Sequence, residues 1–283
     1  MKSLIAVCLI VSAILLFFGC SENEKSGDSP YDMVLVKGGL FVMGKTDQSA
    51  GHYITVSSFY LGKYELTQKE WIAVAGYNSS WFKGDSLPVE QVDWLDVFRF
   101  CNNISIEAGF QPCYRIDGQI LSGELPTVTD ENIWSVIDTL SQLVTCNFNA
   151  DGYRLPTEAE WEFAARGGNR SKNYLFCGGN DLTDVAWFID NSDRKTHPVG
   201  LKRPNEIGLY DMSGNVIERC WDWYEEYSNR YQIDPTGPAE GTTRIMRGGS
   251  WSSGDNSCTI AYRHHHPSYR DYSTGFRLCR NAD

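Results

Sequence analysis

Hard oxygen donors are concentrated in residues 211–218 (DMSGNVIE). Asp211 and Glu218 stand at the two ends of this segment, and Gly214 between them permits a sharp turn. Calcium takes roughly six to eight oxygen ligands from carboxylates and backbone carbonyls, so this spacing suits a calcium site. The alternative is that the two carboxylates only hydrogen-bond the backbone of the turn.

Cysteine is the second residue type that could carry chemistry. The chain has nine cysteines, two of which fall in the first twenty residues, and the remaining seven could pair in an oxidising compartment with at least one thiol left over. No Cys-x-x-Cys pair is present, which argues against a structural zinc site and a thioredoxin-like motif. Two pairings are considered: Cys113 with Cys146, which flank one segment, and Cys220 with Cys258.

Three consecutive histidines at 264–266 offer imidazoles, which suit iron, copper and zinc. Neighbouring side chains on a strand point to opposite faces, so the three cannot readily share one ion. The sequence therefore favours a solvated or substrate-facing loop over a metal site. A hydrolase is not favoured either, because the Gly-x-Ser-x-Gly motif is absent and acidic pairs such as Glu225–Glu226 fall in a polar loop.

The helices that must position these residues are marked by their caps. Helices are expected at 67–75, at about 94–107 with Asp93 as N-cap, and at 157–166. The first and third begin with Thr followed three residues later by Glu, which is the capping-box pattern. In the second, Leu95, Phe98, Cys101 and Ser105 share one face.

Strands are expected mainly at the two ends of the chain. Residues 33–60 alternate short apolar runs with glycine, which is typical of strands joined by tight turns, and further short strands are expected within 244–251, 259–264 and 275–279. The stretch from 114 to 150 is interpreted as an insertion closed at its base by Cys113 and Cys146, with a hairpin first and helical spacing later.

The N-terminus resembles a lipoprotein export signal. Lys2 precedes an apolar run at 4–18 that is short for a spanning helix, and the run ends at Gly19-Cys20, where a lipobox would place the lipid-modified cysteine. We expect a signal at 1–19, a lipid on Cys20, a flexible polar tether at 20–31 and one domain at 32–283. A plain secretory signal with an incidental cysteine is the alternative.

The formal charge of −11 becomes −12 without the first nineteen residues, because Lys2 is their only charge. Such a surface repels nucleic acid and offers no basic stripe, so DNA and RNA binding are excluded. Aromatic residues reach 13%. They either fill an irregular core or line a groove for a peptide or a sugar.

Several motifs, in a fixed order, point to a known family. Residues 152–168 (GYRLPTEAEWEFAARGG) are followed by 195–200 (KTHPVG), 205–218 (NEIGLYDMSGNVIE), 247–251 (RGGSW) and 275–277 (GFR), and are preceded by 38–44 (GGLFVMG) and 64–68 (YELTQ). Over roughly residues 32–280 the chain resembles the formylglycine-generating enzyme (sulfatase-modifying factor) family. The resemblance implies an α+β, C-type-lectin-like fold that is loop-rich, with few short antiparallel strands and two or three helices.

The resemblance also implies a ligand set for structural calcium. The ligands would be the side chains of Asp211 and Glu218 and the backbone carbonyls of Gly214 and Val216. The family's other calcium site would fall within 184–200, where no ligands are assigned.

Enzymes of this family use copper(I) and oxygen to oxidise a protein cysteine to formylglycine. Their two copper cysteines lie three and eight residues after the Ser of Gly-Gly-Ser, which places Ser253 and Cys258 at these positions here. A hydroxyl is a hard donor and replaces a thiolate poorly at copper(I). Cys258 is thus the one candidate catalytic residue, and formylglycine generation is not expected.

The resemblance also implies a disulfide between Cys101 and a cysteine directly after Phe276-Arg277. Leu278 stands at that position and Cys279 lies one residue further, so this disulfide is in doubt.

Three functions remain open. The first is a binding or accessory lipoprotein, anchored to the membrane at the cell envelope and facing the periplasm or the cell surface, for an exported protein, peptide or glycan. The second is a copper-dependent oxidoreductase with Cys258 as its reactive thiol, which requires a second soft ligand nearby. The third is a structural subunit of an envelope complex, which a large exposed apolar patch would favour.

Overall fold

A computed structural model describes residues 29–46, 48–124, 139–266 and 270–282. The expected signal at 1–19, Cys20 and most of the tether lie outside these ranges, as does most of the helical stretch expected late in the insertion. Among the described helices, none is long and apolar enough to cross a membrane.

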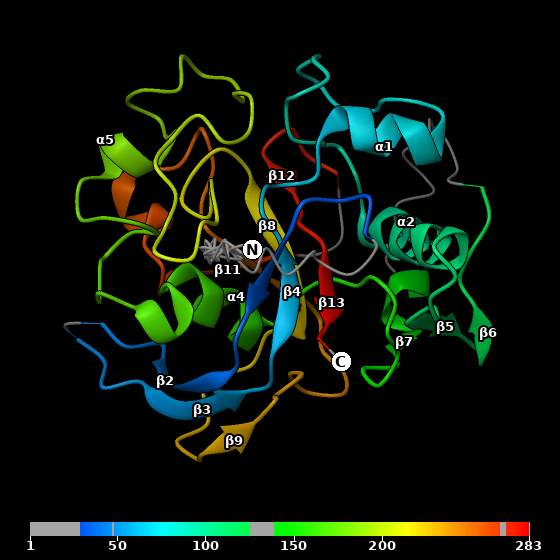
Figure 1. Ribbon diagram of the computed structural model, residues 1–283, viewed down its shortest axis with the longest axis horizontal. Helices are drawn as coiled ribbons and strands as arrows, with labels where there is room; N and C mark the ends of the chain where they lie inside the picture. The colour runs from blue at the N-terminus through cyan, green and yellow to red at the C-terminus, as the bar shows by residue number, and fades with distance from the viewer. Residues whose placement is uncertain (1–28, 47, 125–138, 267–269, 283) are drawn as a thin grey trace, which may run out of the picture.

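The described strands form four small sheets (Figure 1). The first has the order β1 (Met33–Val36), β4 (Phe59–Gly62), β13 (Cys279–Asn281). The second has the order β11 (Arg263–His266), β10 (Arg244–Arg247), β8 (Ile217–Trp223), β12 (Thr274–Gly275). The third contains β2 (Gly39–Met43), β3 (His52–Val56) and β9 (Gln232–Ile233), and the fourth contains β6 (Gln119–Ile120), β5 (Tyr114–Ile116) and β7 (Val144–Cys146). The pairs are antiparallel except β12 with β8 and β3 with β9.

The three expected helices are confirmed as α1 (Gln68–Ala75), α2 (Trp94–Glu107) and α4 (Glu158–Ala165). Each begins with a complete capping box, in which the N-cap side chain and the third helical residue satisfy each other's backbone N–H groups. Short additional helices were not expected: α5 (Leu182–Val185) and the 3₁₀ turns η2 (Gly168–Arg170) and η3 (Asp255–Cys258). Segments of three or four residues are too short to leave a periodic pattern in the sequence.

The strand expectations are confirmed near the N-terminus and partly wrong near the C-terminus. All four strands within 33–62 are present. The stretch 259–264 contains a turn up to Tyr262, so β11 starts only at Arg263, and 276–278 interrupts the expected final strand. The seven-residue strand β8 was missed because it is buried on both faces and lacks the alternation that marks a half-exposed strand.

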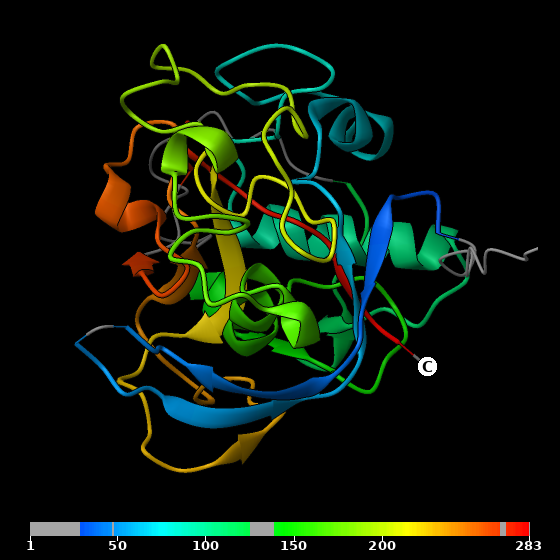
Figure 2. The same ribbon diagram turned by 60° about the vertical axis from the view of Figure 1, so that its left-hand side comes forward.

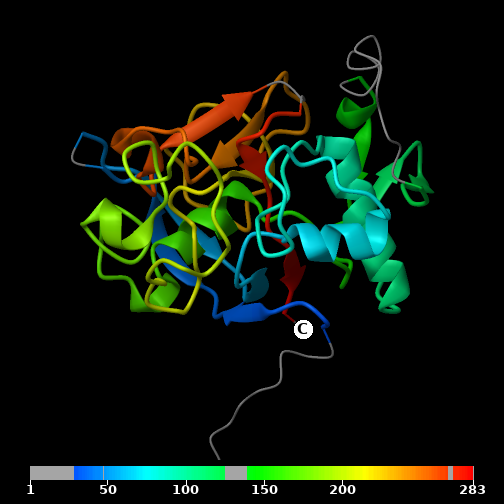
Figure 3. The same cartoon turned by 90° about the horizontal axis from the view of Figure 1, so that it is seen from above.

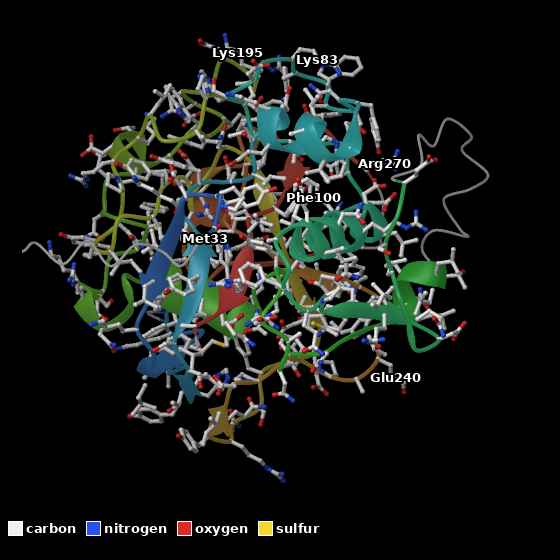
Figure 4. The ribbon with its side chains drawn as sticks, turned by 45° about the vertical axis from the view of Figure 1, so that its right-hand side comes forward. Met33, Lys83, Phe100, Lys195, Glu240 and Arg270 are labelled. Carbon is white, nitrogen blue, oxygen red and sulfur yellow. The ribbon has the colours of Figure 1, made fainter. Side chains whose placement is uncertain are left out.

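The core has two main parts, on either side of the central strands β4, β8 and β13 (Figures 1 and 3). One part packs α1 and α2 against the insertion, with Trp71 stacked on Phe100 at 5.1 Å between ring centroids; Figure 4 shows Phe100 inside this half. The other packs α4 against the curved sheet of β2, β3 and β9, which lies along one side of the molecule (Figure 2).

Candidate functional site

The Gly-Gly-Ser-Trp segment turns sharply after β10 and brings distant residues close to its backbone. Gly248 and Gly249 have φ angles of 93° and 72°, a region that L side chains rarely adopt. A Cβ atom on Gly249 would lie 2.8 Å from the sulfur of Cys258. Glycine at 249 is therefore required both by the turn and by the thiol packed against it.

Cys258 ends η3 and is completely buried. Its neighbours are apolar side chains: Phe176, Leu182, Val185, Ala186 and Phe188. Burial raises the pKa of its thiol from 9.0 to about 12, and the carboxylate of Asp255 adds to this effect. At neutral pH the group is a protonated thiol, whereas copper(I) requires a thiolate.

Ser253 is held by its own loop. Its hydroxyl accepts a hydrogen bond from the backbone N–H of Ser250 at 3.0 Å and lies 3.3 Å from the hydroxyl of Ser250.

The pairing of Cys258 with Cys220 that the sequence suggested is wrong, because Cys220 lies on β8 in the core cluster around α4 and Cys258 packs in a separate cluster. Both are free cysteines, and no other cysteine belongs to the described cluster around Cys258.

Glu65, Asp211 and Glu218 bring three buried carboxylates into one region. Glu65 accepts hydrogen bonds from the side-chain amide of Asn215 at 2.6 Å and from the backbone N–H of Val216 at 3.0 Å. Burial is the main cause that raises the pKa of Glu65, and the charges of Asp211 and Glu218 raise it further. Arg277 is the cation of this group and pairs directly with Glu218.

The donor chemistry around Asp211 fits a calcium ion better than that around Glu218. One Asp211 oxygen accepts from the Gly200 N–H at 2.7 Å, whereas the other, Oδ1, is buried without a hydrogen-bond partner. Burial raises the pKa of Asp211 to about 6 because the charged carboxylate is removed from water. A bound cation would lower the free energy of this buried charge. Both oxygens of Glu218 already accept from Arg277, and one also accepts from the indole of Trp161 at 2.7 Å.

Clusters of three or more His, Cys, Asp or Glu side chains placed to hold a metal ion are absent from the described residues. The calcium set implied by the resemblance contains only two such side chains, together with the carbonyls of Gly214 and Val216, and is therefore smaller than those clusters. If the ion is bound, Asp211 and the two carbonyls would hold it, and Glu218 would contribute only by sharing a lone pair with its arginine.

The three histidines lie on strand β11, paired with β10, and not in the loop that the sequence favoured. Neighbouring histidines on this strand point to opposite faces. His264 lies toward the ring of Tyr262, with 4.5 Å between centroids, and its Nε2 is 3.3 Å from the Ser257 carbonyl. His265 stacks on Tyr224 at 4.0 Å. Because these two neighbours have different partners, they do not form a common metal site.

A surface hollow of about 690 Å³ lies beside η3. Its walls carry two cations, two tyrosines, amide side chains and short apolar residues: Lys45, Thr46, Gln48, Arg166, Asn173, Tyr174, Leu175, Asn180, Asn256, Thr259, Ile260, Ala261 and Tyr262. A second hollow of about 310 Å³ shares Lys45, Arg166 and Asn173 with it and runs toward Leu40. We name the two together the Tyr262 groove.

No local pattern in the sequence marks the Tyr262 groove, because its lining comes from three stretches far apart in the chain, within residues 40–48, 163–180 and 256–262. Arg166 is fixed at the end of α4, where its Nε donates to Glu162 at 2.8 Å and an NH2 group donates to the Lys45 carbonyl at 3.1 Å. Lys45 and Arg166 place positive charge in this groove on a chain whose net charge is −11. Hydrogen-bonding groups beside two rings suit a polar, chain-like ligand.

Comparison with known proteins identifies this architecture. The family model of the sulfatase-modifying factor enzyme 1-like domain matches residues 19–282. The chain belongs to this family. Its fold is also that of the family: the structure of Treponema denticola variable protein 1 superposes with a TM-score of 0.78 at 34% identity, covering 88% of this chain and 95% of that one.

Two relatives with this domain are named for different activities. The chaperone protein LppX of Paenibacillus barcinonensis is 40% identical over 273 residues, which cover 90% of this chain and 91% of LppX. The formylglycine-generating enzyme of Streptomyces coelicolor is 36% identical over 152 residues, which cover 47% of this chain and 48% of that enzyme. The match to the enzyme thus spans about half of either protein, whereas the match to LppX spans nearly all of both.

The buried state of Cys258 predicts low reactivity. A pKa of about 12 in place of 9.0 lowers the thiolate fraction at pH 8 by roughly 1,000-fold. Alkylation of Cys258 by iodoacetamide should therefore be at least roughly 1,000-fold slower in the folded protein than in urea, as measured by peptide mass spectrometry. Rapid labelling of Cys258 in the folded protein would contradict this assignment.

Proposed function

We propose that this member of the family is an exported accessory lipoprotein that binds another exported polypeptide and does not generate formylglycine. The observation that carries the proposal is the state of the two copper positions: Ser253 is a hydroxyl bonded within its loop, and Cys258 is a buried, protonated thiol. Without two thiolates, the soft-ligand pair that copper(I) needs is missing.

The accessory role is supported by the relationship to LppX. That protein is named a chaperone, and the two chains match over about nine-tenths of each. A chaperone needs a surface that accepts polypeptide rather than a reactive group. The Tyr262 groove supplies backbone-like hydrogen-bonding partners and aromatic rings next to the position where the family's enzymes carry out their chemistry.

The cellular setting of the proposal follows from the N-terminus. The apolar run at 4–18, followed by Gly19-Cys20, supports export and lipid attachment at Cys20. The polar residues up to 31 would then tether the domain to the membrane, on the periplasmic side or at the cell surface. Bound in this way, the domain meets polypeptides as they leave the cytoplasm.

The absence of oxidase chemistry can be tested directly. Incubated with copper(I), oxygen and a Cys-x-Pro-x-Arg peptide, the purified protein should leave the cysteine unchanged in the mass spectrum, because one copper ligand is a serine and the other is protonated. Competition with a chromophoric chelator should show no tight copper(I) site at Cys258, and Cys258→Ser should behave as wild type does. Conversion of the peptide, or copper uptake lost in Cys258→Ser, would restore the copper-dependent oxidoreductase.

Polypeptide binding in the Tyr262 groove predicts a specific loss. A fluorescent, reduced and carboxymethylated polypeptide that cannot refold is a suitable probe, with Kd measured by anisotropy. Tyr262→Ala should weaken binding roughly tenfold, since one aromatic anchor often contributes about 1–2 kcal/mol. Ile120→Ala, which removes an exposed apolar side chain on β6 at the other side of the molecule, should leave Kd unchanged. Equal binding by all three proteins, or binding only of cell-wall glycans, would contradict the proposal.

Structural calcium is proposed at Asp211 with the carbonyls of Gly214 and Val216, on the strength of the buried, unpartnered Asp211 Oδ1. Calcium should raise the Tm of the wild-type protein by several degrees and EGTA should reverse the rise, because the ion binds only the folded state. Asp211→Asn should abolish the shift. Glu240→Gln makes the same chemical change at an exposed site far from the ion (Figure 4) and should retain it. A Tm independent of calcium would refute the site.

A further inference from the structure

Four of the cysteines gather around one buried arginine, away from the Gly-Gly-Ser loop. Arg154 donates a hydrogen bond to the sulfur of Cys279 at 3.3 Å, and its charge acts on the thiols of Cys101, Cys113 and Cys146. These residues come from α2, from the start of β5, from the end of β7 and from β13. Only Cys146 is partly exposed; the other three are fully buried.

Cys113 and Cys146 are the pair that the backbone places together. Tyr114 pairs with Cys146 in the β5–β7 ladder, and the Asn147 N–H donates to the Cys113 carbonyl at 2.8 Å. Cys113 is thus diagonal to Cys146 across the two strands. With strands about 5 Å apart and a rise of about 3.4 Å per residue, their Cα atoms are roughly 6 Å apart. A disulfide spans roughly 4.4–6.8 Å between Cα atoms, so this separation is within reach of one. Diagonal neighbours in a regular ladder face opposite sides, but Cys113 precedes the first residue of β5, and the direction of its side chain decides whether the two sulfurs meet.

The side chains complete this geometry. The Cys146 thiol donates a hydrogen bond to the sulfur of Cys113, and this bond is the main reason why the pKa of Cys113 is lowered despite its burial. The charge of Cys113 in turn raises the pKa of the neighbouring Cys101, whereas the Cys279 thiol donates to Glu160 at 3.7 Å. Two thiols joined by a hydrogen bond, one of them on a partly exposed residue, suit thiol–disulfide exchange.

We propose that Cys113 and Cys146 are a redox site that closes as a disulfide at the base of the insertion 114–145. The oxidant is a disulfide, RSSR, of the kind found in oxidising compartments. Its S–S bond breaks and the Cys113–Cys146 S–S bond forms; the two thiol protons leave with two molecules of RSH. Two electrons pass from the protein thiols to RSSR, and Cys101 and Cys279 remain thiols beside Arg154.

The bond acts on the fourth sheet and the chain it carries. β5, β6 and β7 lie beside α2 at the edge of the molecule (Figure 1), and the hairpin is attached to the core through Cys113, Tyr114 and Asn102. The Asn102 side chain binds both the Tyr114 carbonyl, at 2.7 Å, and the Leu121 carbonyl, at 2.8 Å. A covalent link between 113 and 146 restricts the unfolded chain between them and so stabilises the folded state of the protein. The proposal is independent of what the Tyr262 groove binds.

The test is disulfide mapping of the purified full-length protein after equilibration with oxidised and reduced dithiothreitol. The samples are quenched in acid, alkylated and digested without reduction. We expect one cross-linked peptide pair, containing Cys113 and Cys146, while Cys101, Cys177, Cys220, Cys258 and Cys279 are recovered as alkylated thiols. The Tm of the oxidised protein should exceed that of the reduced protein by several degrees.

Two serine variants separate this site from its neighbours. Cys146→Ser changes a partly exposed residue; it should lose the cross-linked peptide and the redox-dependent Tm shift while keeping the Tm of the reduced wild type. Cys279→Ser removes another thiol near Arg154 and should keep both the cross-link and the shift. A cross-link from Cys113 to Cys101 or to Cys279, or free Cys113 and Cys146 in excess oxidised dithiothreitol, would overturn the proposal.

Discussion

The ion pair between Arg277 and Glu218 is the contact on which the rest of the arrangement depends. Both side chains are fully buried, and the guanidinium also donates to the Gly62 and Tyr210 carbonyls, each at 2.9 Å. It therefore joins the end of β4, the loop before Asp211, strand β8 and the C-terminal strands in a fold whose ladders are short. Desolvating two charges is costly, but removing one partner of such a pair costs about 3–5 kcal/mol.

Other buried arginines also connect elements that no strand pairing joins. Arg154 forms two 2.7 Å bonds with Glu160 and reaches Asn281, which ties α4 to the C-terminus. Arg247 pairs with Glu162 of the same helix, and Arg244 lies over the rings of Trp221 and Trp223. Guanidinium groups suit this task because each presents several donors in a fixed plane and can also lie on an aromatic face. The high aromatic content thus serves the core as well as the groove.

This scaffold can persist while the chemistry of the site changes. The turn at Gly248–Gly249 and the packing around Cys258 depend on backbone conformation and on the neighbouring apolar side chains. Neither depends on the residue at 253, whose hydroxyl is held by its own loop. A serine at that position therefore costs the fold little, and it places a hydroxyl where the resemblance to the family's enzymes expects a copper cysteine. The adjacent groove is unaffected by the change, and a binding function can use it.

The sequence by itself determined the local structure: the capping boxes at Thr67, Asp93 and Thr157, the glycine turns, the family, and a serine at 253 where the resemblance places a copper cysteine. Each of these is encoded within a few neighbouring residues. Tertiary structure alone decided that Glu218 meets an arginine 59 positions away, that the Cys146 thiol bonds Cys113, that Cys220 and Cys258 are apart, and that three distant stretches of chain line one groove. Such contacts depend on which elements pack together, and the periodic pattern of an element shows its buried face but not the partner of that face.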